Sequence, residues 1–411
     1  MELQQLGQFI SQGFDTAKFG NANEIYLQVT QHFALDEIPL KNHYAFGWII
    51  YYALHQQPDH EIAQRKRMLA NYLQLRVEKP HKLHSMILTE AMRLYRNAKD
   101  AAFSARSKEK EIEATTFSIV KFAELWDLNN LRPGDWNRKI FEGKEMSSTA
   151  EKFITLYVDE LEETHVLPSP SFIEVVDRAI LEFKDSFNLM MQRAAIHQLA
   201  GEIEPARQLL RNAILYAPGK HFLWSRLASL YSPEEDPRRH VALLYKALRA
   251  PGPEQYKGKI RLSLARALMF KDLHHNALWE LNRVKSTYEA NGWHQPTAYK
   301  EILGKIPHDT VAEDPEGLYR RLEHIADDEI YSALPKIPVT KTYHKNPDPN
   351  LSSNWSRGGY GRPAVAWRVT AEDGTNYWIQ PHRFGLQPDL PLGTPLFIRL
   401  HNSRPVKAEL A

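Results

Sequence analysis

The stretch from His221 to Tyr231 reads HFLWSRLASLY, and it decides how the central part of the chain is interpreted. Its apolar residues recur at i, i+3, i+4 and i+7, which is the period of one face of an α-helix. After a polar break the same period returns, so the two segments together predict a pair of antiparallel helices. Small residues are needed where two such helices cross closely, and large residues fill the space between them. The positions that carry this pattern are Trp224, Leu227, Ala228, Tyr231, Leu244 and Ala247.

The helix-pair pattern extends in both directions along the chain. One copy begins at Phe187, 34 residues before His221, and another begins near Gly258. The earlier copy carries Gly201 in its turn, then Ala206, Leu210, Ala213 and Pro218; the later copy carries Leu264, Ala265, Asp272 in its turn, Ala277, Leu281 and Val284. Two features depart from the pattern. His240 stands where the second helix favours Ala, and Pro-Gly-Pro at 251–253 shifts the last copy by three residues.

This spacing resembles the tetratricopeptide repeat, W-x2-L-G-x2-Y…A-x3-F…P, over about residues 187–290. The resemblance implies that the helix pairs stack into a right-handed solenoid whose concave groove binds a partner protein. The first helix of each pair would line that groove, which nominates Arg193, His197 and Arg226 as contact residues. The alternative is that the array serves only as a rigid spacer.

Helical periodicity covers almost the whole chain up to about residue 335, so the expected fold is mainly α. Residues 1–165 are expected to form an N-terminal helical domain of degenerate helix pairs, and residues 171–333 hold the tetratricopeptide-like repeats. Residues 334–356 contain four prolines and little periodicity, which predicts a linker. Residues 357–411 are expected to form a small β-barrel.

The hydrophobic period changes to two in the C-terminal segment. Two sets of residues alternate in three runs: Trp367 and Val369 flank Arg368, Tyr377 and Ile379 flank Trp378, and Leu396, Ile398 and Leu400 alternate with Phe397 and Arg399. Turn-forming residues at 372–374, 392–394 and 402–405 separate these runs. Four or five short strands in so short a segment predict a small closed or partly closed barrel.

The C-terminal segment also resembles the second half of cold-shock and S1-type OB barrels. Residues 377–380 (YWIQ) correspond to the V-F-V-H strand, and residues 390–397 (LPLGTPLF) approximate L-x-x-G-x-x-V-x-F, whereas the element K-G-F-G-F-I has no faithful counterpart. The resemblance implies binding of single-stranded nucleic acid, RNA or DNA, with bases stacked on aromatic rings and basic side chains on phosphates. The residues nominated for this contact are Trp378, His382, Arg383, Arg362 and Arg399. The alternative is that Trp367, Trp378 and Phe397 form a core or a protein-docking surface.

Composition narrows the function classes. The 411 residues carry a net charge of +2 and no cysteine, which excludes disulfide scaffolds, zinc–cysteine sites, iron–sulfur centres and thiol nucleophiles. Residues 336–411 hold ten Lys and Arg against five Asp and Glu, so a polyanion contact is expected there. No G-x-x-x-x-G-K-[ST], HExxH or G-x-S-x-G motif is present, and we therefore expect no enzyme activity, no metal and no cofactor.

No signal peptide is expected, because the first twenty residues lack a basic region followed by an apolar stretch. The most apolar run, residues 45–54, is shorter than the roughly 20 residues that a membrane span needs. The sequence thus predicts a cytoplasmic, non-enzymatic adaptor without membrane contact. Helical repeats joined to a cold-shock or S1-like barrel resemble proteins of bacterial anti-phage loci, which implies a role in defence beside a partner protein. The alternative is a pure protein–protein scaffold whose barrel is another docking surface.

Overall fold

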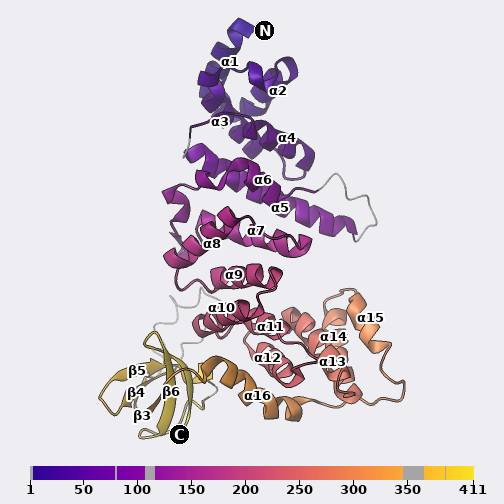
Figure 1. Ribbon diagram of the computed structural model, residues 1–411, viewed down its shortest axis with the longest axis vertical. Helices are drawn as coiled ribbons and strands as arrows, with labels where there is room; N and C mark the ends of the chain where they lie inside the picture. The colour runs from indigo at the N-terminus through magenta and orange to yellow at the C-terminus, as the bar shows by residue number, and fades with distance from the viewer. Residues whose placement is uncertain (1–2, 79–80, 107–115, 346–364, 385) are drawn as a thin grey trace. The chain divides into compact units, whose positions relative to one another are not determined.

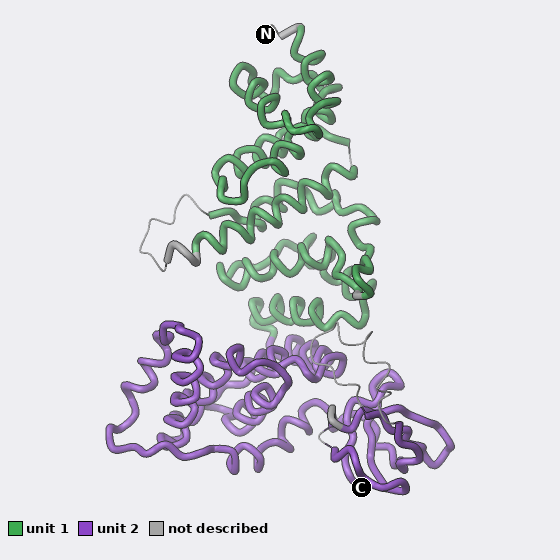
Figure 2. The backbone as a smooth tube through the Cα atoms, turned by 180° about the vertical axis from the view of Figure 1, so that it is seen from behind, with its two compact units in different colours: residues 1–202 green, residues 203–411 purple. Residues whose placement is uncertain are grey.

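The computed structural model describes residues 3–78, 81–106, 116–345, 365–384 and 386–411 (Figure 1). The chain divides into two compact units, residues 1–202 and residues 203–411 (Figure 2). Within the described residues, no helix combines the length and the apolar character that a membrane span requires.

Unit 1 is built almost entirely of helices that share one continuous apolar core. The sequence expectation of a helical N-terminal region is therefore confirmed. Its helices are α1 (Leu3–Thr16), α2 (Ala22–His32), α3 (His43–Gln56), α4 (Ile62–Leu73), α5 (Lys82–Arg106), α6 (Ile119–Trp126), α7 (Thr149–Thr164), α8 (Pro170–Glu182) and α9 (Phe187–Leu199). Between α6 and α7 lie the short 3-10 helices η5 (Leu128–Asn130) and η6 (Pro133–Trp136) and a hairpin of β1 (Lys139–Phe141) and β2 (Lys144–Met146).

Local signals fix the start of the helices α7 and α8. Ser148 caps α7: its hydroxyl accepts a hydrogen bond from the backbone N–H of Glu151, and the Glu151 carboxylate accepts one from the N–H of Ser148. Ser169 caps α8 and is followed by Pro170, whose fixed φ suits the first helical position. These caps set the register of both helices.

Unit 2 begins with helices α10 (Ile203–Tyr216), α11 (His221–Ser229), α12 (Pro237–Arg249), α13 (Gly258–Met269), α14 (His274–Ala290), α15 (Thr297–Leu303) and α16 (Glu316–Tyr331). Helices α9, α11 and α13 start at Phe187, His221 and Gly258, the residues from which the repeat was counted. Helix α11 packs on α12, and α13 packs on α14, so the predicted helix pairing is confirmed there. Gly201 and Asp272, predicted in turns, adopt positive φ angles of 78° and 55°.

His240 departs from the repeat pattern for a visible reason. The side chain is buried, and its Nδ1 lies 2.9 Å from the carbonyl oxygens of both Ala228 and Tyr231 at the end of α11. Backbone carbonyls at a helix C-terminus have no partner within the helix, and a side chain of the neighbouring helix satisfies them here. A small Ala at this position could not make that contact.

Helix α16 packs against α12 and joins the helices of unit 2 through one buried carboxylate. Glu329 forms ion pairs with Arg211 at 2.7 Å and with Arg239 at 3.3 Å, and it also accepts a hydrogen bond from the hydroxyl of Tyr231. The four side chains come from α10, the loop after α11, α12 and α16. The network therefore fixes the position of α16, from which the C-terminal sheet continues.

The C-terminal part of unit 2 is a curled antiparallel half-barrel of five strands. They are β3 (Lys336–Lys345), β4 (Ala366–Ala371), β5 (Asn376–Ile379), β6 (Pro395–His401) and β7 (Arg404–Leu410), with the 3-10 helix η9 (Pro381–Phe384) after β5. The strands are arranged in the order β5-β4-β3-β6-β7, and the outer strands β5 and β7 approach each other. The core contains Trp367, Val369, Ile379, Leu396 and Ile398 from the alternating runs, together with Val339 and Ala408, and Tyr377 and Leu400 pack against it.

Strand β3 corrects the sequence analysis, which assigned residues 334–356 to a linker. Residues 336–345 instead form the central strand, paired with both β4 and β6. The apolar alternation was hard to recognise because Pro338 interrupts it and Lys341 occupies an inward position. The Lys341 ammonium lies 4.2 Å from the centre of the Trp367 ring and donates a hydrogen bond to the carbonyl of Leu390. The rest of the predicted linker lies outside the described residues.

Candidate nucleic-acid interface

The outer face of the half-barrel carries a row of three side chains from three neighbouring strands. Tyr343 on β3 is paired in register with Arg368 on β4, and Arg368 is paired with Trp378 on β5. Trp378 is 54 % exposed and Tyr343 is 46 % exposed, so both rings face solvent. Trp367, next to Arg368 on β4, and Ile379, next to Trp378 on β5, lie in the core. The alternation of the strands thus separates a structural tryptophan from an exposed one.

A β-bulge places Tyr343 in this row. Val339 and Lys341 point into the half-barrel, and strict alternation would also send Tyr343 inward. The register shifts between Lys341 and Tyr343, so that Thr342 is the extra residue and Tyr343 pairs with the outward Arg368. Sequence alternation missed Tyr343 because a bulge of this kind leaves no signal in the hydrophobic pattern.

Tyr343 contacts both of the other side chains. The Arg368 guanidinium lies 5.5 Å from the centre of the Tyr343 ring, and the rings of Tyr343 and Trp378 meet edge to face with centres 6.1 Å apart. Within the described ranges, no carboxylate lies within ion-pair distance of Arg368, and its buried Nε has no hydrogen-bond acceptor. A cation that is held by aromatic rings and lacks an acidic partner remains available to an incoming anion.

A row of uncharged polar side chains runs beside the aromatic row. The hydroxyls of Thr342 and Thr370 are 2.8 Å apart, and the Thr370 hydroxyl donates to the amide oxygen of Asn376 at 2.8 Å. These side chains lie on β3, β4 and β5 and are exposed. The surface therefore offers two aromatic rings, one cation and several small hydrogen-bonding groups, without a carboxylate in either row.

The other residues nominated for nucleic-acid contact lie elsewhere. His382 and Arg383 belong to η9, directly after β5, and their side chains are outside the described part of the structure. Arg362 lies outside the described residues. Arg399 is on the outer side of β6, where its guanidinium donates to the carbonyl oxygens of Tyr331 at 2.9 Å and Leu334 at 2.7 Å.

Arg399 thereby caps the C-terminal end of α16, where carbonyl groups lack helical partners. Lys407 on β7 adds an ion pair of 2.6 Å with Asp327 of the same helix. The half-barrel is anchored to the helices through β6 and β7. The aromatic face on β3, β4 and β5 is not used for this contact.

The side chains nominated for the repeat groove are already engaged within the chain. Arg193 on α9 forms an ion pair of 2.8 Å with Asp177, and His197 lies 2.5 Å from a carboxylate oxygen of Glu202. Arg226 lies on α11 and is partly buried. Helix α9 belongs to unit 1 and α11 to unit 2.

Comparison with known proteins gives a partial family match. Residues 189–326, about a third of the chain, match the model of a family described only as a domain of unknown function, DUF7017. The match covers most of α9 and the helices of unit 2 up to α16, and it does not include the half-barrel. No curated protein matches the chain. In the described ranges, no three or more His, Cys, Asp or Glu side chains are grouped as a metal ion would require.

Proposed function

We propose that this protein is a non-enzymatic adaptor whose C-terminal half-barrel binds single-stranded nucleic acid, with RNA as the expected form. The observation that carries the proposal is the exposed row of Tyr343, Arg368 and Trp378. Bases stack on aromatic rings whatever their sequence, because every base has a π-face. An arginine without an acidic partner supplies the positive charge that a phosphate needs.

The order of the strands supports the same proposal. If the five strands are numbered along the chain from β3, their order across the sheet is third, second, first, fourth, fifth. The third and fifth strands approach each other. A partly open five-stranded Greek-key barrel of the OB type has the same strand order, and in such barrels the face of the second and third strands binds oligonucleotides. Those strands are β4 and β5 here, and they carry Arg368 and Trp378.

The use of the opposite strands argues against a purely protein-docking role for the aromatic face. The contacts of Arg399 and Lys407 with α16 already dock the half-barrel through β6 and β7. The repeats, which resemble tetratricopeptide units, would hold a partner protein, and the half-barrel would bring nucleic acid to it. The alternative is a scaffold that binds proteins through both the repeats and the half-barrel. The experiment below distinguishes the two.

The test is fluorescence anisotropy with the full-length protein and labelled oligonucleotides of about 12 nucleotides, a length within the range that one OB barrel covers. Single-stranded RNA, single-stranded DNA and duplex DNA of matched length are compared between about 50 and 200 mM salt. We expect saturable binding of the single strands, weakening as salt rises. Absence of binding at the lowest salt, or equal binding of the duplex, would refute the proposal and favour the scaffold.

A further inference from the structure

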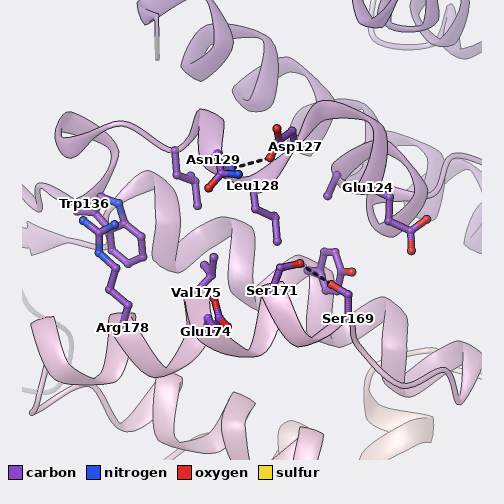
Figure 3. A pocket seen from close by; sticks show the side chains of 13 residues that line it. Glu124, Asp127, Leu128, Asn129, Trp136, Ser169, Ser171, Glu174, Val175 and Arg178 are labelled. Atoms are coloured by element: carbon purple, nitrogen blue, oxygen red, sulfur yellow. Dashed lines mark hydrogen bonds between the residues drawn. The ribbon is translucent and has the colours of Figure 1, made fainter. Parts of the chain in front are cut away.

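Unit 1 contains a pocket with a volume of about 480 Å³. It lies between the end of α6, the helix η5 and the first turns of α8, and η6 and α7 also contribute to its wall (Figure 3). Its size is within the range of roughly 300–1,000 Å³ that is usual for ligand-binding pockets. The pocket is formed entirely by residues 123–178, so it is a site of unit 1 alone.

The inner wall of the pocket is apolar and uncharged. Leu131, Trp136 and Tyr157 line it and are buried. Burial raises the pKa of the Tyr157 hydroxyl to about 12, and the charge of Glu124 adds to the shift although a hydrogen bond with Ser169 opposes it. The hydroxyl is therefore neutral at physiological pH. Such a wall favours an aliphatic or aromatic group of a ligand.

The rim of the pocket carries charges of both signs that do not neutralise each other. Glu124 and Glu174 are exposed, and among the described residues neither has a cationic side chain within ion-pair distance. Glu174 and Arg178 have the i,i+4 spacing that favours an ion pair on a helix. Arg178 instead lies over the ring of Trp136, with its guanidinium 4.4 Å from the ring centre.

The positive and negative groups are separated along the pocket. Figure 3 shows Arg178 and Trp136 together at one end and Glu124 toward the other. The indole N–H of Trp136 is buried and has no acceptor within the described part of the chain. One end therefore offers hydrogen-bond donors, and the rest of the rim offers carboxylates.

We propose that this pocket binds a peptide segment that carries a lysine or arginine beside apolar residues. The alkyl stem of the basic side chain lies along the apolar wall, and its cationic head pairs with a rim carboxylate, Glu124 or Glu174. The guanidinium of Arg178 and the indole N–H of Trp136 donate to carbonyl oxygens of the peptide backbone.

The hydrogen-bond donors Arg178 and Trp136 favour a peptide over a small polyamine as the ligand. A polyamine has only cationic groups and no acceptor for Arg178 or Trp136, and the Arg178 charge repels it. A peptide brings a cation and carbonyl acceptors together, so it satisfies both ends of the pocket. The hydroxyls of Ser169 and Ser171 and the amide of Asn129, which also line the pocket, offer further groups for a peptide backbone.

The experiment measures anisotropy of a fluorescein-labelled peptide of alternating leucine and lysine, blocked at both ends, with the full-length protein. The test variant is Glu124→Gln with Glu174→Gln. The matched control is Glu24→Gln with Glu182→Gln, which removes two exposed carboxylates of unit 1 outside the pocket. The same peptide with glutamate in place of lysine tests the need for a cation, and unlabelled spermine tests the polyamine as a competitor.

We expect saturable binding of the lysine peptide, a Kd about fivefold higher for each rim carboxylate neutralised, and an unchanged Kd in the control variant. Circular dichroism of both variants establishes that they are folded, since all four positions are exposed. No saturable binding of the lysine peptide, or equal weakening by the control variant, would overturn the proposal. Displacement of the peptide by spermine at equal concentration would also overturn it, because the occupant would then be the polyamine.

Discussion

Replacement of Trp378 by alanine is the most direct test of the nucleic-acid interface. The ring is 54 % exposed, and its outward position on β5 leaves the core residues Trp367 and Ile379 untouched. We therefore expect a small change in the free energy of unfolding. Any large change in binding would then come from the lost ring surface itself.

The expected magnitude follows from the exposed area of one ring. Stacking of one base on an aromatic side chain contributes about 1–3 kcal/mol. Because Trp378 is 54 % exposed and its ring also meets the ring of Tyr343, we take the middle of that range. A loss of about 2 kcal/mol corresponds to roughly a 30-fold higher Kd.

The assay is the same anisotropy titration of single-stranded RNA with full-length Trp378→Ala. Trp378→Phe should retain most of the affinity, because it keeps an aromatic face. Trp293→Ala is a matched control, since Trp293 is 45 % exposed and lies after α14, outside the half-barrel. If Trp378→Ala binds RNA as tightly as the unmodified protein, or if Trp293→Ala weakens binding equally, the stacking argument is refuted.

Three further substitutions each test the role of one charged side chain. Arg368→Gln should weaken RNA binding and lower the slope of log K against log salt by about 0.7, as expected for one lost phosphate contact on a single strand, and an unchanged slope would contradict this role. Arg261→Met should lower the free energy of unfolding of unit 2 by about 3–5 kcal/mol in chemical denaturation, because the buried carboxylate of Glu280, 2.6 Å from the guanidinium, loses its cation. A loss below about 1 kcal/mol would contradict this. Burial alone would raise the pKa of Glu151, but hydrogen bonds from Arg138 and Ser148 outweigh burial and lower that pKa below 4.5. The ion pair of Glu151 with Arg138 therefore stabilises unit 1 above this pH, and the stabilisation is lost as the pH falls. Thermal unfolding of Glu151→Gln should accordingly depend less on pH below about 4.5 than that of the unmodified protein, and an equal dependence would show that other groups cause it.

The candidate stacking ring could be nominated from the chain without the structure. The alternation of the strands left open whether Trp378 faces solvent or joins Trp367 in a core, because a period of two does not say which face is buried. In the structure Trp378 is exposed and Trp367 is buried. The side-chain positions of His382, Arg383 and Arg362 stay predictions, because they depend on segments outside the described part of the structure.

Sequence reasoning gave Arg399 a role that the structure assigns to packing. Arg399 was nominated for nucleic-acid contact, yet its guanidinium donates to the carbonyls at the end of α16. Nothing in the local sequence indicates that a helix which ends some 70 residues earlier lies against this strand. Contacts between residues far apart in the chain carry no periodicity by which to recognise them.

The sequence by itself determined the helices and the pairing of α11 with α12 and of α13 with α14. Apolar period, turn glycine and small crossing residues are local properties, and helices α9, α11 and α13 begin at the residues from which the repeat was counted. Tertiary structure alone decided that residues 336–345 are the central strand, that a bulge turns Tyr343 outward, and that Arg368 and Trp378 complete its row. The physical reason is that a strand is stabilised by hydrogen bonds and packing from distant segments, whereas much of what defines a helix lies within its own few turns.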